Sequence, residues 1–268
     1  MTTDTKTQSA TTSPSTLYYE MRGSGAPVLL IPGTPGDGGQ FEALADVMAR
    51  DRLVITYDRV GTSRSPAPSG WSTTNVAEQA DDAVRLLRSL TTEPATVFGT
   101  SNGALIALEL ALRHPTVVAK AVLHEAPLLS VLSDPEPVGS MLGELIGTAM
   151  AVGGPPAALQ AFLRFAYGDT IVDSWSDDLR GRFLANAEMV FGVELPAFQA
   201  YRPDEGALAS PHAPLLVVVG AEQRSPFFLE AAAWLSSHSS SPLIRTPGAH
   251  GPQFSCPEAL ASMLFRDE

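Results

Sequence analysis

Strand-length apolar runs alternate with helical patterns along most of this chain of 268 residues, and this alternation limits its fold more than any other feature. Several runs are almost continuously apolar and bounded by Gly or Pro, as expected for strands covered on both faces of a parallel sheet. The expected strands lie at 17–21, 28–31, 53–57, 95–98, 121–124, 215–219 and 242–245, and the expected core helices at 41–50, 75–90, 103–114, 227–237 and 257–265. Such alternation predicts an α/β fold with a mostly parallel, doubly wound sheet.

The alternation stops between about Pro127 and Pro211, where the pattern is helical without intervening strands. We therefore expect a core formed by 17–127 and 211–268, interrupted by a helical cap at 128–210. An insertion of this kind is expected to cover the C-terminal edge of the sheet, where ligands bind in open α/β folds. Residues 1–16 are almost all small and polar, and we expect them to form a disordered tail.

Composition excludes several classes of function. The chain has 17 Lys and Arg against 29 Asp and Glu, a net charge of −12, which argues against binding to nucleic acid. No apolar stretch approaches the roughly 18 residues of a transmembrane helix, so no membrane partner is expected. A single cysteine, Cys256, forms neither an intrachain disulfide nor a cysteine-based metal site. Because the first residues lack the apolar segment of a secretory signal, we expect a cytoplasmic protein.

The sharpest motif is Gly-Thr-Ser-Asn-Gly at 99–103, between an expected strand and an apolar helix. In this context a Gly-x-Ser-x-Gly sequence predicts a sharp turn that lifts the serine hydroxyl above the edge of the sheet. Ser101 is therefore the candidate nucleophile, and a serine that only caps the helix is the structural alternative. The backbone amide of Asn102, the next residue, is a candidate oxyanion donor.

A second oxyanion donor is expected from the Gly- and Pro-rich loop at 31–39. Pro35 has no amide hydrogen, and glycines allow the backbone to approach a ligand closely, so Thr34 is the candidate. The loop lacks the Gly-x-Gly-x-x-Gly spacing of a dinucleotide site and a following Lys-Ser/Thr pair. No cofactor or metal is therefore expected.

The base and acid of a catalytic triad are expected later in the chain, in the order serine, acid, histidine. His250 lies in the loop after the last expected strand, in Pro-Gly-Ala-His, and is the candidate base. The acid has two candidates. Glu125 directly follows the strand at 121–124, whereas Glu222 lies in the loop after 215–219, one position before Gln223, where an Asp is more usual. From the residues alone, Glu125, Glu222 or neither can be the acid.

These motifs together resemble the α/β-hydrolase superfamily over about Leu17–Pro127 and Ala213–Glu268. The resemblance is carried by the loop at 31–39, the segment 57–65 (Tyr-Asp-Arg-Val-Gly-Thr-Ser-Arg-Ser), the turn at 99–103 and Pro-Gly-Ala-His at 247–250. Within that superfamily, His-Glu-Ala-Pro at 124–127 is similar to the zearalenone-lactonase type. Those enzymes place the triad glutamate after the sixth strand, so the resemblance implies that Glu125 is the acid.

Ser101, His250 and Glu125, with oxyanion donors at Thr34 and Asn102, lead us to expect a serine hydrolase of neutral, apolar esters or lactones. Trp175 and Met189, in the expected cap, are the candidate substrate contacts. The expected partner is a small-molecule substrate, and association with a second copy of the chain is left open. Two alternatives are carbon–carbon bond hydrolysis on the same triad and a non-catalytic ligand receptor of this fold.

Overall fold

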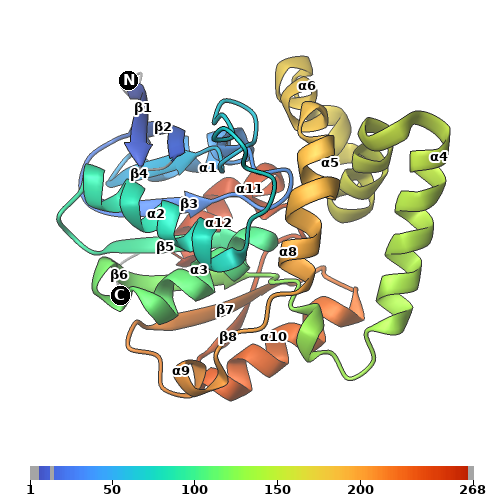
Figure 1. The fold of residues 1–268 in the computed structure, drawn as a ribbon. Helices are drawn as coiled ribbons and strands as arrows, with labels where there is room; N and C mark the ends of the chain where they lie inside the picture. The colour runs from blue at the N-terminus through green and yellow to red at the C-terminus, as the bar shows by residue number, and fades with distance from the viewer. Residues whose placement is uncertain (1–5, 13–14, 265–268) are drawn as a thin grey trace.

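The computed structural model describes residues 6–12 and 15–264, and an eight-stranded sheet runs through its centre (Figure 1). The strands are β1 (Lys6–Thr12), β2 (Ser15–Arg22), β3 (Ala26–Ile31), β4 (Arg52–Tyr57), β5 (Ala95–Thr100), β6 (Val118–His124), β7 (Leu215–Gly220) and β8 (Leu243–Thr246). Their order across the sheet is β1-β2-β4-β3-β5-β6-β7-β8. The β1–β2 and β2–β4 pairs are antiparallel, and all other neighbours are parallel. This arrangement confirms the predicted fold class.

Helices cover both faces of the sheet, because successive side chains of a strand point to opposite faces. Leu29 and Ile31 of β3 pack in the core cluster that contains α2 (Val76–Leu90), α3 (Asn102–Arg113) and α10 (Pro226–Ser239). Val28 and Leu30 pack in a second cluster with α1 (Glu42–Met48) and α12 (Pro257–Leu264). Both sides of β3 are therefore buried, which explains why its sequence is continuously apolar.

The amino-terminal segment differs from its prediction. We expected residues 1–16 to form a disordered tail, but Lys6–Thr12 forms β1 and pairs with β2, which begins at Ser15. Residues 1–5 and 13–14 lie outside the described residues. Low apolar content does not prevent an edge strand, since backbone hydrogen bonds hold it, and the Thr residues of this segment favour extended backbone.

Between residues 128 and 210 the chain forms no strand. Its elements are η3 (Leu129–Val131), α4 (Glu136–Tyr167), α5 (Asp169–Ser174), α6 (Asp177–Ala185), α7 (Ala187–Met189), a π-helical turn η4 (Val190–Glu194), α8 (Leu195–Gln199) and α9 (Glu205–Ala209). The helix α4 is broken at Gly153 and Gly154, just before Pro155 and Pro156. Figure 1 shows α4, α5, α6 and α8 at one end of the sheet rather than on its faces. Within the described part of the chain, every helix falls short of what spanning a bilayer requires.

A buried ion pair joins this helical segment to the core. Arg59, in the loop after β4, lies 2.6 Å from Glu194 at the end of η4, and each side chain is 1% exposed. The guanidinium also donates to Gln79 of α2 at 2.8 Å and lies over the ring of Phe198 in α8. Since an unpaired charge in such a site is costly, the pair holds η4 and α8 against the core loop.

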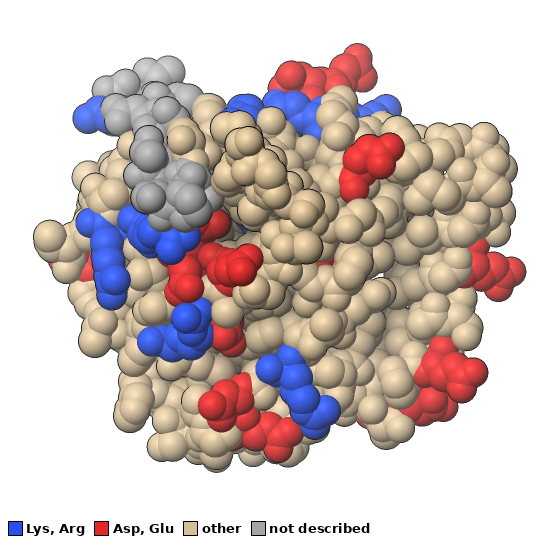
Figure 2. All heavy atoms as spheres, in the orientation of Figure 1, with Lys and Arg blue, Asp and Glu red and all other residues tan. Residues whose placement is uncertain are grey.

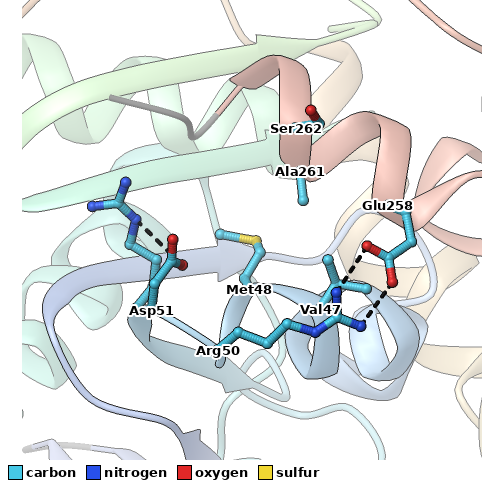
Figure 3. A pocket seen from close by; sticks show the side chains of 8 residues that line it. Val47, Met48, Arg50, Asp51, Glu258, Ala261 and Ser262 are labelled. Atoms are coloured by element: carbon cyan, nitrogen blue, oxygen red, sulfur yellow. Dashed lines mark hydrogen bonds and ion pairs between the residues drawn. The ribbon is translucent and has the colours of Figure 1, made fainter. Parts of the chain in front are cut away.

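On one face of the sheet, α1 and α12 pack together and leave a groove between them (Figure 3). The exposed side chains of Arg50 and Glu258 form an ion pair across it at 2.8 Å. None of the predicted site residues lines this groove. The groove is therefore separate from the candidate site.

We expect Glu194→Ala to destabilise the protein by about 3–5 kcal/mol, because it leaves the Arg59 guanidinium buried without a carboxylate. The double variant Arg59→Met/Glu194→Leu removes both charges and should recover most of that loss. Urea unfolding measures both free energies. Glu258→Ala breaks the exposed Arg50 pair and should have a much smaller effect. A Glu194→Ala variant as stable as the wild type would contradict this account.

Candidate active site

Ser101 occupies a sharp turn between β5 and α3, with φ 53° and ψ −130°. A Cβ atom at Gly99 would collide with the carbonyl oxygen of Gly103, and one at Gly103 with that of Ile31. Only glycine fits these two positions, so the sequence itself enforces the turn. The Ser101 amide donates to the carbonyl of His124 at 2.9 Å, which ties the turn to the end of β6.

Glu125 follows β6 directly and also has a positive φ, 46°. Its amide donates to the carbonyl of Val218 at 2.9 Å, which continues the pairing of β6 with β7. The carboxylate is almost fully buried. Its Oε1 accepts from the amide of Gly220 at 2.8 Å, and its Oε2 accepts from Gln223 Nε2 at 2.7 Å. A strained backbone and a buried charge are features that cluster at functional sites, and Glu125 has both.

His250, in the loop after β8, completes this cluster. Its Nδ1 lies 2.7 Å from Oε2 of Glu125. An ionised carboxylate can only accept, so Nδ1 carries the hydrogen and Nε2 of a neutral ring is free to accept a proton. The ring is buried and stacks on Phe228, with centroids 4.8 Å apart. The structure therefore brings Glu125 to His250.

Glu222, the other candidate acid, has an exposed side chain, and its backbone amide donates to Gly248. The carboxylate that contacts His250 Nδ1 is that of Glu125. The side-chain direction changes between these two adjacent residues of the loop. Glu222 is exposed, whereas Gln223 is buried and points toward Glu125. Sequence reasoning excluded Gln223 as the acid but missed its contact with Glu125, which its place in the loop after β7 could have indicated.

Burial alone raises the pKa of Glu125, but hydrogen bonds and the electrostatic influence of His124 and His250 together outweigh this effect. The bond from His250 is the largest of the lowering contributions, the Gly220 amide adds to it, and the pKa falls from 4.5 to about 2. His124, at the end of β6, is fully buried beside Glu125, and burial lowers its pKa from 6.5 to about 4. Its Nδ1 lies 2.9 Å from Thr100 Oγ1. At neutral pH the site therefore holds an ionised Glu125 beside a neutral His124.

The loop with Thr34 lies against the serine turn. A Cβ atom at Gly33 would come within 2.9 Å of the Ser101 Cβ, so glycine permits this close approach. Thr34 Oγ1 accepts from Asn102 Nδ2 at 2.8 Å, and both residues are buried. Among the described residues, neither the Thr34 nor the Asn102 amide has an intramolecular acceptor. The two predicted oxyanion donors are thus brought together beside Ser101.

Three side chains from the helical segment hold the same loop. Arg182 donates to Asp37 at 2.7 Å, and Asn186 Nδ2 donates to the carbonyl of Pro35 at 3.0 Å. The Glu194–Arg59 pair reaches the loop through Arg59 Nη2, which lies 3.4 Å from the carbonyl oxygen of Gly33. The position of the loop next to Ser101 therefore depends on residues more than 140 positions later in the chain.

Ser101 and His250 line one cavity of about 350 Å³. Its other walls are mainly apolar and come from the loop after β6, from α4 and α8, and from the start of α10: Leu129, Leu142, Phe162, Phe165, Tyr167, Leu195, Phe198, Phe227 and Phe228. Arg224 and Glu222, of opposite charge, contribute to the same wall. A cavity of this size and lining suits a small, largely apolar ligand.

Neither predicted substrate contact lines this cavity, and we correct both here. Trp175 is buried in a separate cluster within the helical segment, where its ring packs edge-on against Tyr167 and Phe183. Met189 lies against Gly61 and Trp71 instead. Trp175 and Met189 are both apolar residues of the expected cap, but only the tertiary packing decides which apolar residues of that segment line the cavity. Phe162, Phe165 and Phe198 do so.

No group of three or more His, Cys, Asp or Glu side chains suited to a metal ion occurs in the range the structure describes. In Figure 2, Lys and Arg side chains are scattered over the visible face, and the charged side chains in view near α4 are acidic. This face therefore presents no basic patch that would attract a polyanion.

Because the pKa of Glu125 is low, we expect the unfolding free energy of the protein to depend on pH. Its folded-state pKa of about 2 is below the ordinary value, so its contribution, about 3 kcal/mol, is complete above pH 4.5 and is lost as the pH falls toward 2. The difference in unfolding free energy between the wild type and Glu125→Gln should therefore shrink between pH 7 and pH 3. Chemical denaturation at both values measures it. A difference that does not change with pH would contradict the low pKa assigned to Glu125.

The chain is similar to known hydrolases over parts of its length. A family model described as alpha/beta hydrolase fold matches residues 26–148. The chain is 43% identical over 116 residues to an uncharacterized hydrolase, YraK, of Bacillus subtilis (strain 168), over 43% of each chain. It is 34% identical over 136 residues to a zearalenone hydrolase of Bionectria ochroleuca, over 48% of this chain and 52% of that protein. The chain thus spans about half or less of the length of these curated relatives.

Solved structures match over nearly the whole chain. A hydrolase from Pseudomonas aeruginosa PA01 superposes with a TM-score of 0.75 at 19% identity, covering 97% of this chain and 99% of that one. The enol-lactonase from Burkholderia xenovorans LB400 superposes with a TM-score of 0.76 at 16% identity, covering 96% and 98%. At such low identity these likenesses describe architecture alone. The sheet, its covering helices and these matches agree, and the chain has the alpha/beta hydrolase fold.

Proposed function

We propose that this protein is a serine hydrolase that cleaves a neutral, largely apolar carboxylic ester or lactone through an acyl-enzyme on Ser101. The observation that carries the proposal is the 2.7 Å contact between His250 Nδ1 and Glu125 in the wall of the cavity that Ser101 also lines. A buried carboxylate that orients a histidine beside a serine on a sharp turn is the arrangement that nucleophilic acyl transfer requires.

In the proposed reaction, Ser101 Oγ attacks the substrate carbonyl carbon while Nε2 of His250 takes the hydroxyl proton. Glu125 keeps the hydrogen on Nδ1 and stabilises the imidazolium that forms, without itself becoming protonated. His250 then gives its proton to the leaving oxygen, and the alcohol departs, or stays attached to the acyl group when the substrate is a lactone. Water activated by His250 hydrolyses the acyl-enzyme and restores Ser101.

The oxyanion of the tetrahedral intermediate is assigned to the backbone amides of Thr34 and Asn102. Their lack of intramolecular acceptors within the described chain and the closeness of Gly33 to Ser101 support this role. Preorganised amides stabilise developing negative charge in a water-poor site. The scheme needs neither a metal nor an organic cofactor.

The proposed substrate class follows from the cavity. Its aromatic and aliphatic walls favour an apolar acyl or ring group, and Arg224 and Glu222 offset each other's charge. We take residues 128–210 to be a cap over the site, since α4 and α8 supply several of these walls. The names of a zearalenone hydrolase and an enol-lactonase among the similar proteins are consistent with ester or lactone chemistry.

A fluorophosphonate probe tests the nucleophile. We expect intact-mass analysis to show a single adduct and peptide mapping to place it on Ser101, because only an activated serine reacts rapidly with such probes. Ser101→Ala should abolish labelling, whereas Ser237→Ala, an exposed serine of α10, should leave it unchanged. Failure of the folded wild type to react would favour a ligand receptor instead.

Kinetics of Glu125→Gln test the acid. An amide in place of the carboxylate no longer stabilises the imidazolium, and we expect kcat for an activated ester to fall by roughly 10³- to 10⁴-fold. Glu222→Gln makes the same chemical change at the other candidate acid. Because Glu222 lines the cavity but does not contact His250, we expect kcat to change by less than about threefold, with any larger effect confined to KM. If Glu222→Gln alone abolishes turnover, the acid is assigned wrongly.

A further inference from the structure

Gln223 is a buried amide whose orientation the backbone determines. Its Oε1 accepts from the amide of Arg224 at 2.9 Å and from that of Ser225 at 2.8 Å. Because backbone amides can only donate, the oxygen must face them, and the Nε2 group must face the other way. It faces Glu125, at 2.7 Å from Oε2.

One oxygen of the Glu125 carboxylate accepts two hydrogen bonds. Oε2 of Glu125 accepts from Gln223 Nε2 and from His250 Nδ1, each at 2.7 Å. The other oxygen, Oε1, accepts from the amide of Gly220 at 2.8 Å. Both oxygens of the carboxylate are therefore hydrogen-bonded. Among the described residues, Gln223 and His250 are the two side chains that donate to it.

We propose that Gln223 is a positioning residue, whose amide holds Oε2 of Glu125 toward His250 Nδ1. It thereby keeps the hydrogen on Nδ1 and leaves Nε2 free to accept the proton of Ser101. This inference rests on the proposed function for its effect on turnover. The hydrogen bond it assigns is independent of whether the protein turns over a substrate.

The chemistry of the site explains why residue 223 is an amide. An apolar side chain of similar size would leave Oε2 with one donor, so that only His250 and the Gly220 amide would hold the carboxylate. An ionised carboxylate at 223 would lie against the ionised Glu125, and repulsion would displace one of them unless the two shared a proton. An amide fixed by Arg224 and Ser225 supplies the donor at every pH.

Two variants test the proposal in the full-length protein, with an activated ester as substrate. Gln223→Met removes the donor and should lower kcat about tenfold or more. Since Gln223 also lines the cavity, KM can change too, but by a smaller factor than kcat. Gln223→Glu restores a donor only while the new carboxyl group is protonated. Its kcat should therefore fall with rising pH over a range in which the wild type stays level. Ser237→Ala, an exposed serine of α10 that does not line the cavity, should behave as the wild type.

A second measurement does not require turnover. In proton NMR, the hydrogen on His250 Nδ1 should give a downfield signal in the wild type. In Gln223→Met this signal should broaden or exchange faster with solvent. Thermal unfolding of each variant separates this effect from loss of the fold.

The outcomes separate the two proposals. If the wild type neither hydrolyses activated esters nor reacts with a fluorophosphonate, the proposed function fails, and the NMR comparison still tests Gln223. If Gln223→Met keeps wild-type kcat and an unchanged Nδ1 signal, and Gln223→Glu keeps the wild-type pH profile, Gln223 is not a positioning residue.

Discussion

The carboxyl ends of the parallel strands meet at one edge of the sheet, and the candidate site depends on this convergence. Ser101 follows β5, Glu125 follows β6, Gln223 follows β7 and His250 follows β8. These four strands are neighbours in this order. Residues separated by as many as 149 positions therefore come together at this edge.

At this edge the backbone is fixed more firmly than a surface loop would be. The Ser101 amide bonds to the end of β6, and the Glu125 amide bonds to β7, so two site residues extend the ladders of the sheet beyond the strands. Both residues have positive φ, a strained conformation that the surrounding hydrogen bonds maintain. A rigid base of this kind keeps the serine and the carboxylate in fixed relative positions.

The opposite wall of the site is supplied by the helical segment between β6 and β7. Its contribution is of two kinds. Aromatic side chains of α4 and α8 enclose the cavity over Ser101. Polar and charged side chains, Arg182, Asn186 and Glu194, hold the loop that carries Thr34. The buried Arg59–Glu194 pair couples these two tasks, since Arg59 touches both the loop and the Phe198 ring that lines the cavity.

The sequence by itself determined the α/β alternation, the serine turn and the strand-end positions of Glu125 and His250, because local periodicity and glycine sterics set these features. For the acid, the residues alone left Glu125, Glu222 or neither, and the family resemblance favoured Glu125. Only the tertiary structure decided that Glu125 contacts His250, that Gln223 also hydrogen-bonds to the Glu125 carboxylate, and that Trp175 and Met189 do not line the cavity. The physical reason is that side-chain direction in loops and within a helical layer depends on neighbours distant in sequence. The same holds for Lys6–Thr12, whose strand is held by pairing with β2 rather than by its own composition.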